Sequence, residues 1–151
     1  MAFSGSKNTV IAITGYQFSG KTTVGMMIAK QHGYHYMDDD IFRHALFPKN
    51  DSLDLPSRKR VYAYIREAMM GAAEINLDLG RSMVITSTFG TMEAKQPFLS
   101  LRSRWLEKTS FHIFRLVLSE ESRMTLVRQR AIQRYGTNEE VLQRKIAGYK
   151  K

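Results

Sequence analysis

The sequence predicts a three-layer α/β fold with a parallel sheet of four or five strands. Short β-rich segments alternate with helical segments along the chain, and this order is typical of right-handed crossovers that cover both faces of a parallel sheet. The chain has 151 residues, of which 43% are hydrophobic and 25% charged, values that suit one globular domain. We expect a polar N-terminal extension at residues 1–9 and a single domain at residues 10–151.

The first half of the chain supplies two expected strands and two expected helices. Residues 10–14 form a β-rich run that ends at a glycine, which indicates a buried strand, and residues 22–32 follow with helical spacing. Residues 34–37 should form a second strand. A long helix should begin at Pro56 and end at Gly80, since glycine favours helix ends. Its expected apolar face consists of Val61, Ile65, Ala68, Ala72, Ile75 and Leu79.

The second half continues the alternation. Strands are expected at residues 82–86 and 111–118, with a helix at residues 96–106 between them. Ser119 can cap a helix that runs to about residue 134, and residues 137–140 have the form of a capping box for a last helix that ends near residue 149. Because ligands bind beyond the carboxyl ends of parallel strands, the segments after the first three strands should meet at one site.

Composition narrows the classes of partner and location. The chain has no cysteine, which excludes disulfides and thiolate metal sites. Its net charge of +9 favours nucleotides, nucleic acid or phosphorylated metabolites, although scattered surface Lys and Arg residues would give the same charge. No apolar run approaches the ~20 residues of a membrane helix, and the N-terminus lacks a signal-peptide stretch. We therefore expect a cytoplasmic protein without a membrane partner.

Residues 15–22, Gly-Tyr-Gln-Phe-Ser-Gly-Lys-Thr, match the phosphate-binding pattern G-x-x-x-x-G-K-[ST] in full. Glycines let such a loop curl so that backbone N–H groups point at phosphates, and the helix that follows favours anions at its N-terminus. Lys21 would contact the β- and γ-phosphates, and the Thr22 hydroxyl would ligate Mg²⁺. The expected ATP contacts are Gly15, Tyr16, Gln17, Phe18, Ser19, Gly20, Lys21, Thr22 and Thr23.

Three consecutive aspartates, Asp38, Asp39 and Asp40, follow the second expected strand. A phosphoryl acceptor needs a carboxylate that orients and deprotonates its hydroxyl, and a second carboxylate can hold Mg²⁺ through water. Asp40 and Arg43 are three residues apart and share one face of a helical turn, where Arg43 could bind an anionic part of the acceptor. The alternative is that an aspartate here only caps a helix.

These motifs resemble the P-loop kinases of small substrates, a group that includes shikimate and gluconate kinases, polynucleotide 5′-kinases and zeta-toxin-like kinases. The resemblance runs from about Val10 to Tyr149 and rests on residues 15–25, the aspartates with Arg43, residues 79–89 and an Arg-rich helix. It implies a P-loop NTPase fold, the cofactors ATP and Mg²⁺, and Asp40 as the base. The Asp-x-Asp of shikimate kinases and the Asp three residues before an Arg in polynucleotide kinases both correspond to Asp40.

The expected third strand departs from the pattern of these kinases. Many of them have Val-Ile-Ile/Val-Asp-Ala-Thr there, with an acid near the site, whereas this chain has Val84-Ile-Thr-Ser-Thr88. Thr86 or Ser87 takes the place of the acid, and a hydroxyl adds no charge. Metal binding would then depend more on Thr22 and Asp38.

Arginines near the end of the chain are candidates for contacts with the transferred phosphoryl group. A mobile Arg that closes over this group stabilises its charge. The spacing of Arg130 and Arg134 resembles that of the lid arginines of polynucleotide kinases, whereas Arg123 and Arg128 match less well. A solvated basic face is the alternative.

Three residues are expected to contact the acceptor: Asp38, Arg43 and Arg60. Arg60 lies where these kinases bind their acceptors, in the run Arg58-Lys-Arg60. A basic helix start is, however, more often plain surface, and this alternative stays open.

The sequence therefore predicts an ATP-dependent phosphotransferase that moves the γ-phosphoryl group to a hydroxyl of a small molecule or nucleotide. The expected catalytic residues are Lys21, Asp40, Arg130 and Arg134. The expected metal ligands are Thr22 and Asp38. One alternative is a polynucleotide 5′-hydroxyl kinase, suggested by the net charge of +9. Another is a non-catalytic nucleotide-binding regulator, which the missing acid of the third strand would suit.

Overall fold

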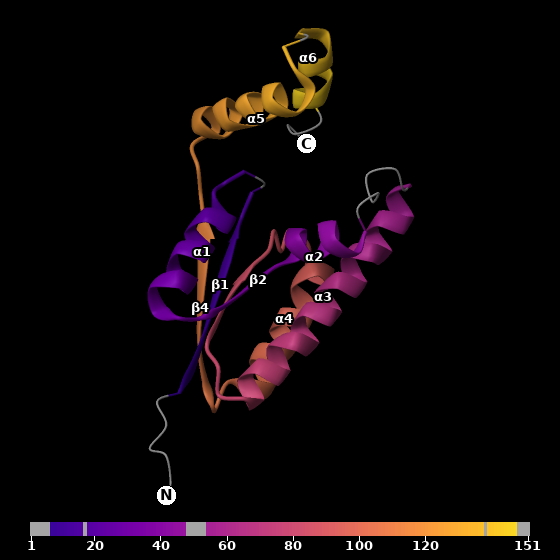
Figure 1. Ribbon diagram of the computed structural model, residues 1–151. Helices are drawn as coiled ribbons and strands as arrows, with labels where there is room; N and C mark the ends of the chain where they lie inside the picture. The colour runs from indigo at the N-terminus through magenta and orange to yellow at the C-terminus, as the bar shows by residue number, and fades with distance from the viewer. Residues whose placement is uncertain (1–6, 17, 48–53, 138, 148–151) are drawn as a thin grey trace, which may run out of the picture.

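The computed structural model describes residues 7–16, 18–47, 54–137 and 139–147. Within these ranges, four strands form one sheet in the order β2-β3-β1-β4, and all neighbouring strands run parallel. Helices cover both faces of the sheet (Figure 1), so the predicted three-layer α/β fold is confirmed. In chain order the elements are β1 (Asn8–Gly15), α1 (Lys21–His32), β2 (His35–Asp38), α2 (Asp39–Leu46), α3 (Leu55–Asp78), β3 (Met83–Thr86), α4 (Met92–Trp105), β4 (Thr109–Leu116), α5 (Glu120–Tyr135) and α6 (Glu139–Ala147).

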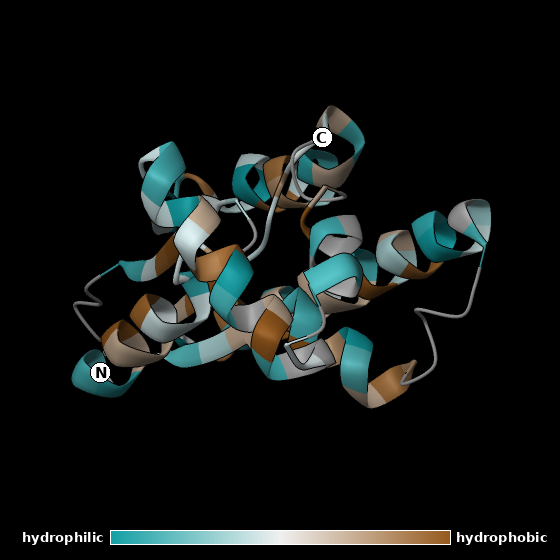
Figure 2. Cartoon of the chain, turned by 90° about the horizontal axis from the view of Figure 1, so that it is seen from above, coloured by the Kyte–Doolittle hydropathy of each residue, from teal (hydrophilic) through white to brown (hydrophobic). Residues whose placement is uncertain are grey.

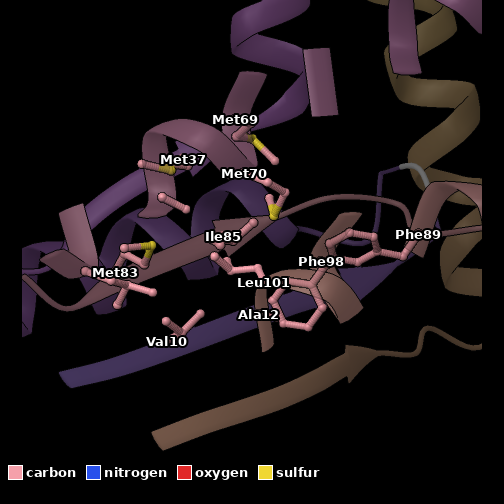
Figure 3. Close-up of a cluster of buried hydrophobic side chains, with 12 residues drawn as sticks. Val10, Ala12, Met37, Met69, Met70, Met83, Ile85, Phe89, Phe98 and Leu101 are labelled. Carbon is pink, nitrogen blue, oxygen red and sulfur yellow. The ribbon is translucent and has the colours of Figure 1, made fainter. Parts of the chain in front are cut away.

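The larger apolar cluster packs the sheet against α3 and α4 (Figure 3). The strands contribute Val10 and Ala12 of β1 and Met83 and Ile85 of β3, positions that alternate with the period of two expected of a strand. The helices contribute Met69, Met70, Ala73, Leu77, Phe98 and Leu101. Burial of this apolar surface is the main force that holds the two layers together.

The opposite face of the sheet packs against α1, through Ile13 and Val84. Helix and sheet approach closely at Gly25. A Cβ atom there would lie 2.6 Å from Thr86 Cγ2 and 2.8 Å from Tyr36 Cε2, so only glycine can occupy the position without displacing its neighbours. This approach brings the start of α1, and with it the phosphate motif, over the ends of β2 and β3.

Helices α5 and α6 lie beyond the carboxyl ends of the strands (Figure 1). Val127 and Ala131 of α5 pack against Ile146 of α6, and Phe18 of the loop after β1 packs against this cluster. Hydrophobic and hydrophilic stretches alternate along the helices seen from above (Figure 2), as expected of helices that are buried on one side. Phe18 thus links the phosphate motif to the pair α5 and α6.

The apolar face predicted for the long helix is partly wrong. Of the predicted residues, Ile75 and Leu79 are 63% and 60% exposed. Ile65 is buried as predicted, but the other buried residues of α3 are Met69, Met70, Ala73 and Leu77. Apolar residues occur on more than one side of α3, and contact with α4 and the sheet, which the sequence pattern does not contain, determines which side is buried.

Several predicted boundaries shift by a few residues. β1 begins at Asn8, so the last two residues of the expected polar extension belong to the strand. α4 begins at Met92, because the Thr91 side chain accepts a hydrogen bond from the Ala94 N–H at 3.2 Å and caps the helix there. β4 spans Thr109–Leu116 in unbroken register with β1. The last predicted helix is present as α6, and its expected end near residue 149 lies outside the described residues.

In the part of the chain that the structure describes, no helix is both long enough and apolar enough to cross a membrane.

We expect Gly25→Ala to lower the melting temperature by several degrees. The added methyl group would meet Thr86 and Tyr36 at 2.6 and 2.8 Å, and overpacking of this kind costs about 1–3 kcal/mol. Gly71→Ala is the matched control, because a Cβ atom at Gly71 of α3 meets no described atom within 4 Å and alanine favours a helix by about 0.5–1 kcal/mol. Thermal unfolding should give shifts of opposite sign, and equal shifts would contradict the close approach of α1.

Candidate active site

The loop between β1 and α1 has the curled backbone that the phosphate motif requires. Gly15 has no room for a side chain, because a Cβ atom would lie 2.6 Å from the Leu116 carbonyl oxygen and 2.7 Å from Ser19 Oγ. Gly20 has a φ of 85° and Phe18 a φ of 66°, both in the left-handed region that glycine adopts readily and other residues rarely. In this conformation, Phe18 packs against the apolar cluster between α5 and α6.

Lys21 and Ser19 supply polar groups to this loop. The Lys21 amine donates hydrogen bonds to the carbonyl oxygens of Gly15 at 3.1 Å and Tyr16 at 2.7 Å. Burial lowers the pKa of Lys21, and the nearby aspartates offset part of this effect. The buried Ser19 hydroxyl has no hydrogen-bond partner among the described residues, which is unusual for a buried polar group. A cation, a hydroxyl and a helix N-terminus are together suited to bind phosphate oxygens.

The other predicted ATP contacts lie on the same loop and the first turn of α1. Thr22 and Thr23 are exposed there. Tyr16 is half exposed, and the guanidinium groups of Arg115 and Arg123 lie 5.7 and 5.2 Å from the centroid of its ring, a cation–π arrangement. Arg123, which matched the resemblance less well, therefore lies beside the phosphate loop.

Asp38, at the end of β2, is surrounded by hydrogen-bond donors. Its Oδ2 accepts hydrogen bonds from the hydroxyls of Thr22 at 3.0 Å, Tyr36 at 2.8 Å and Thr86 at 2.7 Å. Its Oδ1 accepts two N–H groups of α2 at 2.8 and 3.3 Å, so Asp38 is also the N-cap of this helix. Burial alone would raise the pKa of Asp38, but the hydrogen bonds outweigh it and lower the pKa.

Asp39 is buried, as Asp38 is, with a side chain that is 7% exposed. Its Oδ2 accepts a hydrogen bond from Ser87 Oγ at 2.5 Å and lies 3.8 Å from Arg66 Nε. Burial raises the pKa of Asp39 to about 6, although the hydrogen bond from Ser87 and the charge of Arg66 act in the opposite direction. Asp39 therefore holds a proton more readily than an ordinary aspartate.

Asp40 has the exposed carboxylate, with a side chain that is 53% exposed. Its Oδ1 lies 3.3 Å from Nε of Arg43, one helical turn further along α2. Two guanidinium groups lie near the Tyr62 ring of α3, that of Arg43 at 5.7 Å and that of Arg66 at 5.5 Å from its centroid. Two Asp–Arg pairs thus meet around one aromatic ring.

A cavity of about 640 Å³ lies beside the aspartates. Asp39 and Asp40 line it from α2, and Lys59 and Arg66 line it from α3. The segment 88–94, which follows β3 and begins α4, contributes further lining residues. A volume of this size is typical of small-molecule sites.

Four predicted residues lie elsewhere or outside the description. Arg60 is exposed at the start of α3, where its guanidinium donates a hydrogen bond at 3.4 Å to a serine of the same turn, and its neighbour Lys59 lines the cavity instead. Arg130 and Arg134 belong to α5, but their side chains lie outside the described part of the structure, as does the whole of Gln17. The roles of these residues stay predictions.

Sequence reasoning missed Tyr36, Tyr62 and Arg66 and gave Asp39 the least weight of the three aspartates. A signal existed for Tyr36, because residues two apart in a strand share a face, and this places Tyr36 beside Asp38. Tyr62 and Arg66 are four residues apart and share a face of their helix. The sequence does not indicate, however, that this face meets α2.

Oxygen donors are well placed for a divalent cation where the phosphate loop meets the aspartates. Carboxylate oxygens of Asp38, Asp39 and Asp40 lie within 4.8 Å of one another, and the Thr22 hydroxyl bonds to Asp38. Mg²⁺ prefers ligands of this kind. The donor set therefore fits the metal that the phosphate motif implies.

Comparison with known proteins places the chain in a family. The family model AAA_33, described as an AAA domain, matches residues 10–151, so the chain belongs to this family of P-loop domains. No curated protein matches its sequence.

Solved structures of kinases share the fold. A protein from Chloroflexus aurantiacus, provisionally described as a kinase, is similar with a TM-score of 0.74 at 20% identity, over 91% of this chain and 75% of that chain. The Mycobacterium tuberculosis APS kinase CysC in complex with AMPPNP and APS has a TM-score of 0.61 at 19% identity, and the match covers 86% of this chain and 75% of that chain. A chain of the Pnkp1/Rnl/Hen1 RNA repair complex has a TM-score of 0.66 at 14% identity, and the match covers 98% of this chain and 46% of that chain. The resemblance to P-loop kinases is thus confirmed at the level of the fold.

We expect Asp39→Asn to stabilise the metal-free protein at neutral pH. The pKa of Asp39 is about 6 in the folded chain and near 3.8 when unperturbed. Its contribution to stability is therefore complete below pH 3.8 and is lost as the pH rises through 6. At pH 7.5 the ionised side chain costs on the order of 1–3 kcal/mol, which asparagine avoids while it still accepts a hydrogen bond from Ser87. In EDTA the variant should melt several degrees above the wild type at pH 7.5, and the difference should shrink toward pH 4.

The control for this prediction is Asp78→Asn, at the exposed end of α3. This change should not raise the melting temperature at pH 7.5 as Asp39→Asn does, because it relieves no burial of a carboxylate. A difference for Asp39→Asn that stays constant between pH 7.5 and pH 4 would contradict the burial of an ionisable carboxyl at this position.

Proposed function

We propose that the protein is an ATP-dependent phosphotransferase that moves the γ-phosphoryl group to a hydroxyl of a small molecule or nucleotide. The observation that carries this proposal is the hydrogen bond of 3.0 Å between Thr22 of the phosphate loop and Asp38. It joins the loop to a row of carboxylates, two of which line a cavity of small-molecule size. A phosphate donor and an acceptor hydroxyl bound at these two places would be neighbours, as phosphoryl transfer requires.

The loop N–H groups, Ser19 and Lys21 would bind the phosphates. The Lys21 amine, which bonds two carbonyl oxygens of its own loop, would exchange them for oxygens of the β- and γ-phosphates. Mg²⁺ held by Thr22 beside Asp38 would neutralise charge on the same oxygens.

Asp40 is the proposed general base. Its carboxylate is exposed and lines the cavity, so an acceptor hydroxyl can reach it. Asp40 would take the hydroxyl proton while the acceptor oxygen forms a bond to the γ-phosphorus and the bond from this phosphorus to the bridging oxygen breaks, which leaves ADP and the phosphorylated acceptor. Arg43 would hold Asp40 and attract anionic parts of the acceptor. Arg130 and Arg134 would approach the transferred group from α5.

A polynucleotide 5′-hydroxyl is the second candidate acceptor. The net charge of +9 favours anionic acceptors in general, and the similar fold in an RNA repair complex suggests nucleic acid among them. The cavity itself carries both signs of charge, with Lys59 and Arg66 beside four acidic residues. The deciding experiment is a screen of metabolites, nucleosides and 5′-hydroxyl oligonucleotides for conversion of ATP to ADP. A salt-sensitive gel shift with an oligonucleotide would favour the polynucleotide. Binding of ATP without turnover in any pool would favour a non-catalytic regulator.

We expect Lys21→Ala to lower ATP affinity or turnover at least ~10-fold without unfolding the domain, because among the described residues the amine donates its hydrogen bonds to carbonyl groups of the phosphate loop. Lys30→Ala, on the exposed last turn of the same helix, is the matched control and should change neither quantity. A Lys21→Ala variant with normal melting temperature and an unchanged rate would exclude the proposed phosphate site.

We expect Asp40→Asn to reduce kcat by ~10²–10⁴-fold, the usual contribution of a general base, with little change in ATP affinity. Asparagine keeps the size of the side chain and much of its hydrogen bonding, so the fold should persist. Asp39→Asn is the neighbouring control and should reduce kcat much less. Equal losses of kcat in the two variants would show that the base has been assigned to the wrong residue.

A further inference from the structure

Three hydroxyl groups converge on one oxygen of Asp38. Thr22, Tyr36 and Thr86 each place a hydroxyl oxygen 2.7–3.0 Å from Oδ2, while Oδ1 accepts two N–H groups of α2. A carboxylate offers about four lone-pair sites, so protein donors already saturate Asp38. This carboxylate is therefore better placed to act on a cation through a neighbouring group than as a direct ligand.

The neighbouring group is the Thr22 hydroxyl. A hydroxyl carries one hydrogen and two acceptor lone pairs. Because Thr22 donates its hydrogen to Asp38 at 3.0 Å, its lone pairs face away from the carboxylate and stay available to a cation. The orientation of a metal ligand is commonly fixed by a partner of this kind.

Tyr36 and Thr86 hold Asp38 from the sheet. The Tyr36 ring lies under α1, where its Cε2 would be 2.8 Å from a Cβ atom at Gly25, so the close approach of the helix confines the ring. Its hydroxyl lies 2.8 Å from Asp38 Oδ2 and 2.9 Å from Thr86 Oγ1. Thr86 occupies the strand position paired with Asp38. Asp38 is thus fixed by side chains that themselves have little freedom to move.

We propose that Tyr36 is a positioning residue for the divalent cation of the nucleotide site. Together with Thr86 it fixes Asp38, and Asp38 in turn fixes the Thr22 hydroxyl that ligates the cation. This inference rests on the proposed function, since the cation is the one that accompanies ATP. Asp38 of β2, held by hydroxyls, would then act on the cation in a chain whose β3 carries Thr86 and Ser87 in place of an acid.

The test is Tyr36→Phe, which removes the hydroxyl and keeps the ring against Gly25. The affinity for a non-hydrolysable ATP analogue is measured by calorimetry in Mg²⁺ and in EDTA, together with the melting temperature. We expect the affinity in Mg²⁺ to fall about tenfold, a typical loss when a group that orients a metal ligand is removed, and the affinity in EDTA to stay unchanged. A purely structural role of Tyr36 would lower both affinities alike.

Tyr34→Phe is the matched control, because Tyr34 packs in the same cluster beside α1, and it should leave both affinities unchanged. Thr86→Val should reproduce the Mg²⁺-specific loss, whereas Thr86→Ser, which keeps the hydroxyl, should not. If Tyr36→Phe does not fold, the comparison of Thr86→Val with Thr86→Ser tests whether the hydroxyls around Asp38 position the cation.

Two kinds of result would overturn the inference. An affinity of Tyr36→Phe in Mg²⁺ that is unchanged or higher, or an equal loss in EDTA, overturns it and leaves the proposed function intact. A wild-type protein that binds no analogue, or binds it equally well in Mg²⁺ and in EDTA, contradicts the proposed function and this inference with it.

Discussion

The site depends on how the chain accommodates three consecutive carboxylates where the edge strand β2 ends and α2 begins. Their oxygens lie within 4.8 Å of one another, and like charges this close repel strongly where water is excluded. Hydroxyl and N–H donors stabilise Asp38, Ser87 and Arg66 surround Asp39, and solvent with Arg43 stabilises Asp40. The first turn of α2 supplies the N–H donors to Asp38. Arg43 comes from α2 itself, and the packing of α2 on α3 brings Arg66 to Asp39.

The hydroxyl groups of Thr86 and Ser87, at the end of β3, donate hydrogen bonds to the aspartates. Asp38 and Thr86 are paired in the register of β2 and β3, and Ser87 bonds to Asp39 one residue further on. An acid in place of either hydroxyl would lie against a carboxylate and repel it. The hydroxyls of Thr86 and Ser87 instead donate hydrogen bonds to Asp38 and Asp39, so the negative charge of this part of the site stands on the aspartates.

The sequence predicts best those features that local chemistry determines. The phosphate loop, the order of the four strands along the chain and the pairing of Asp40 with Arg43 follow from short motifs and from spacing within one turn. The helix α2 (Asp39–Leu46) was not among the expected elements. The burial of Asp39 and the place of Tyr62 near two arginines depend on how α3 packs against α2. The apolar face of α3 was predicted wrongly for a related reason, since its contacts with distant elements decide which side of the helix is buried.

The choice between two candidate bases shows how geometry and acidity can point in different directions. With a pKa of about 6, Asp39 has the acidity closer to that of an efficient general base at neutral pH. Its Oδ2, however, bonds Ser87 and lies near Arg66, and its side chain is 7% exposed. Asp40 has a carboxylate that is 53% exposed at the cavity. Proton transfer requires hydrogen-bond contact with the acceptor before acidity matters, so access favours Asp40 as the base.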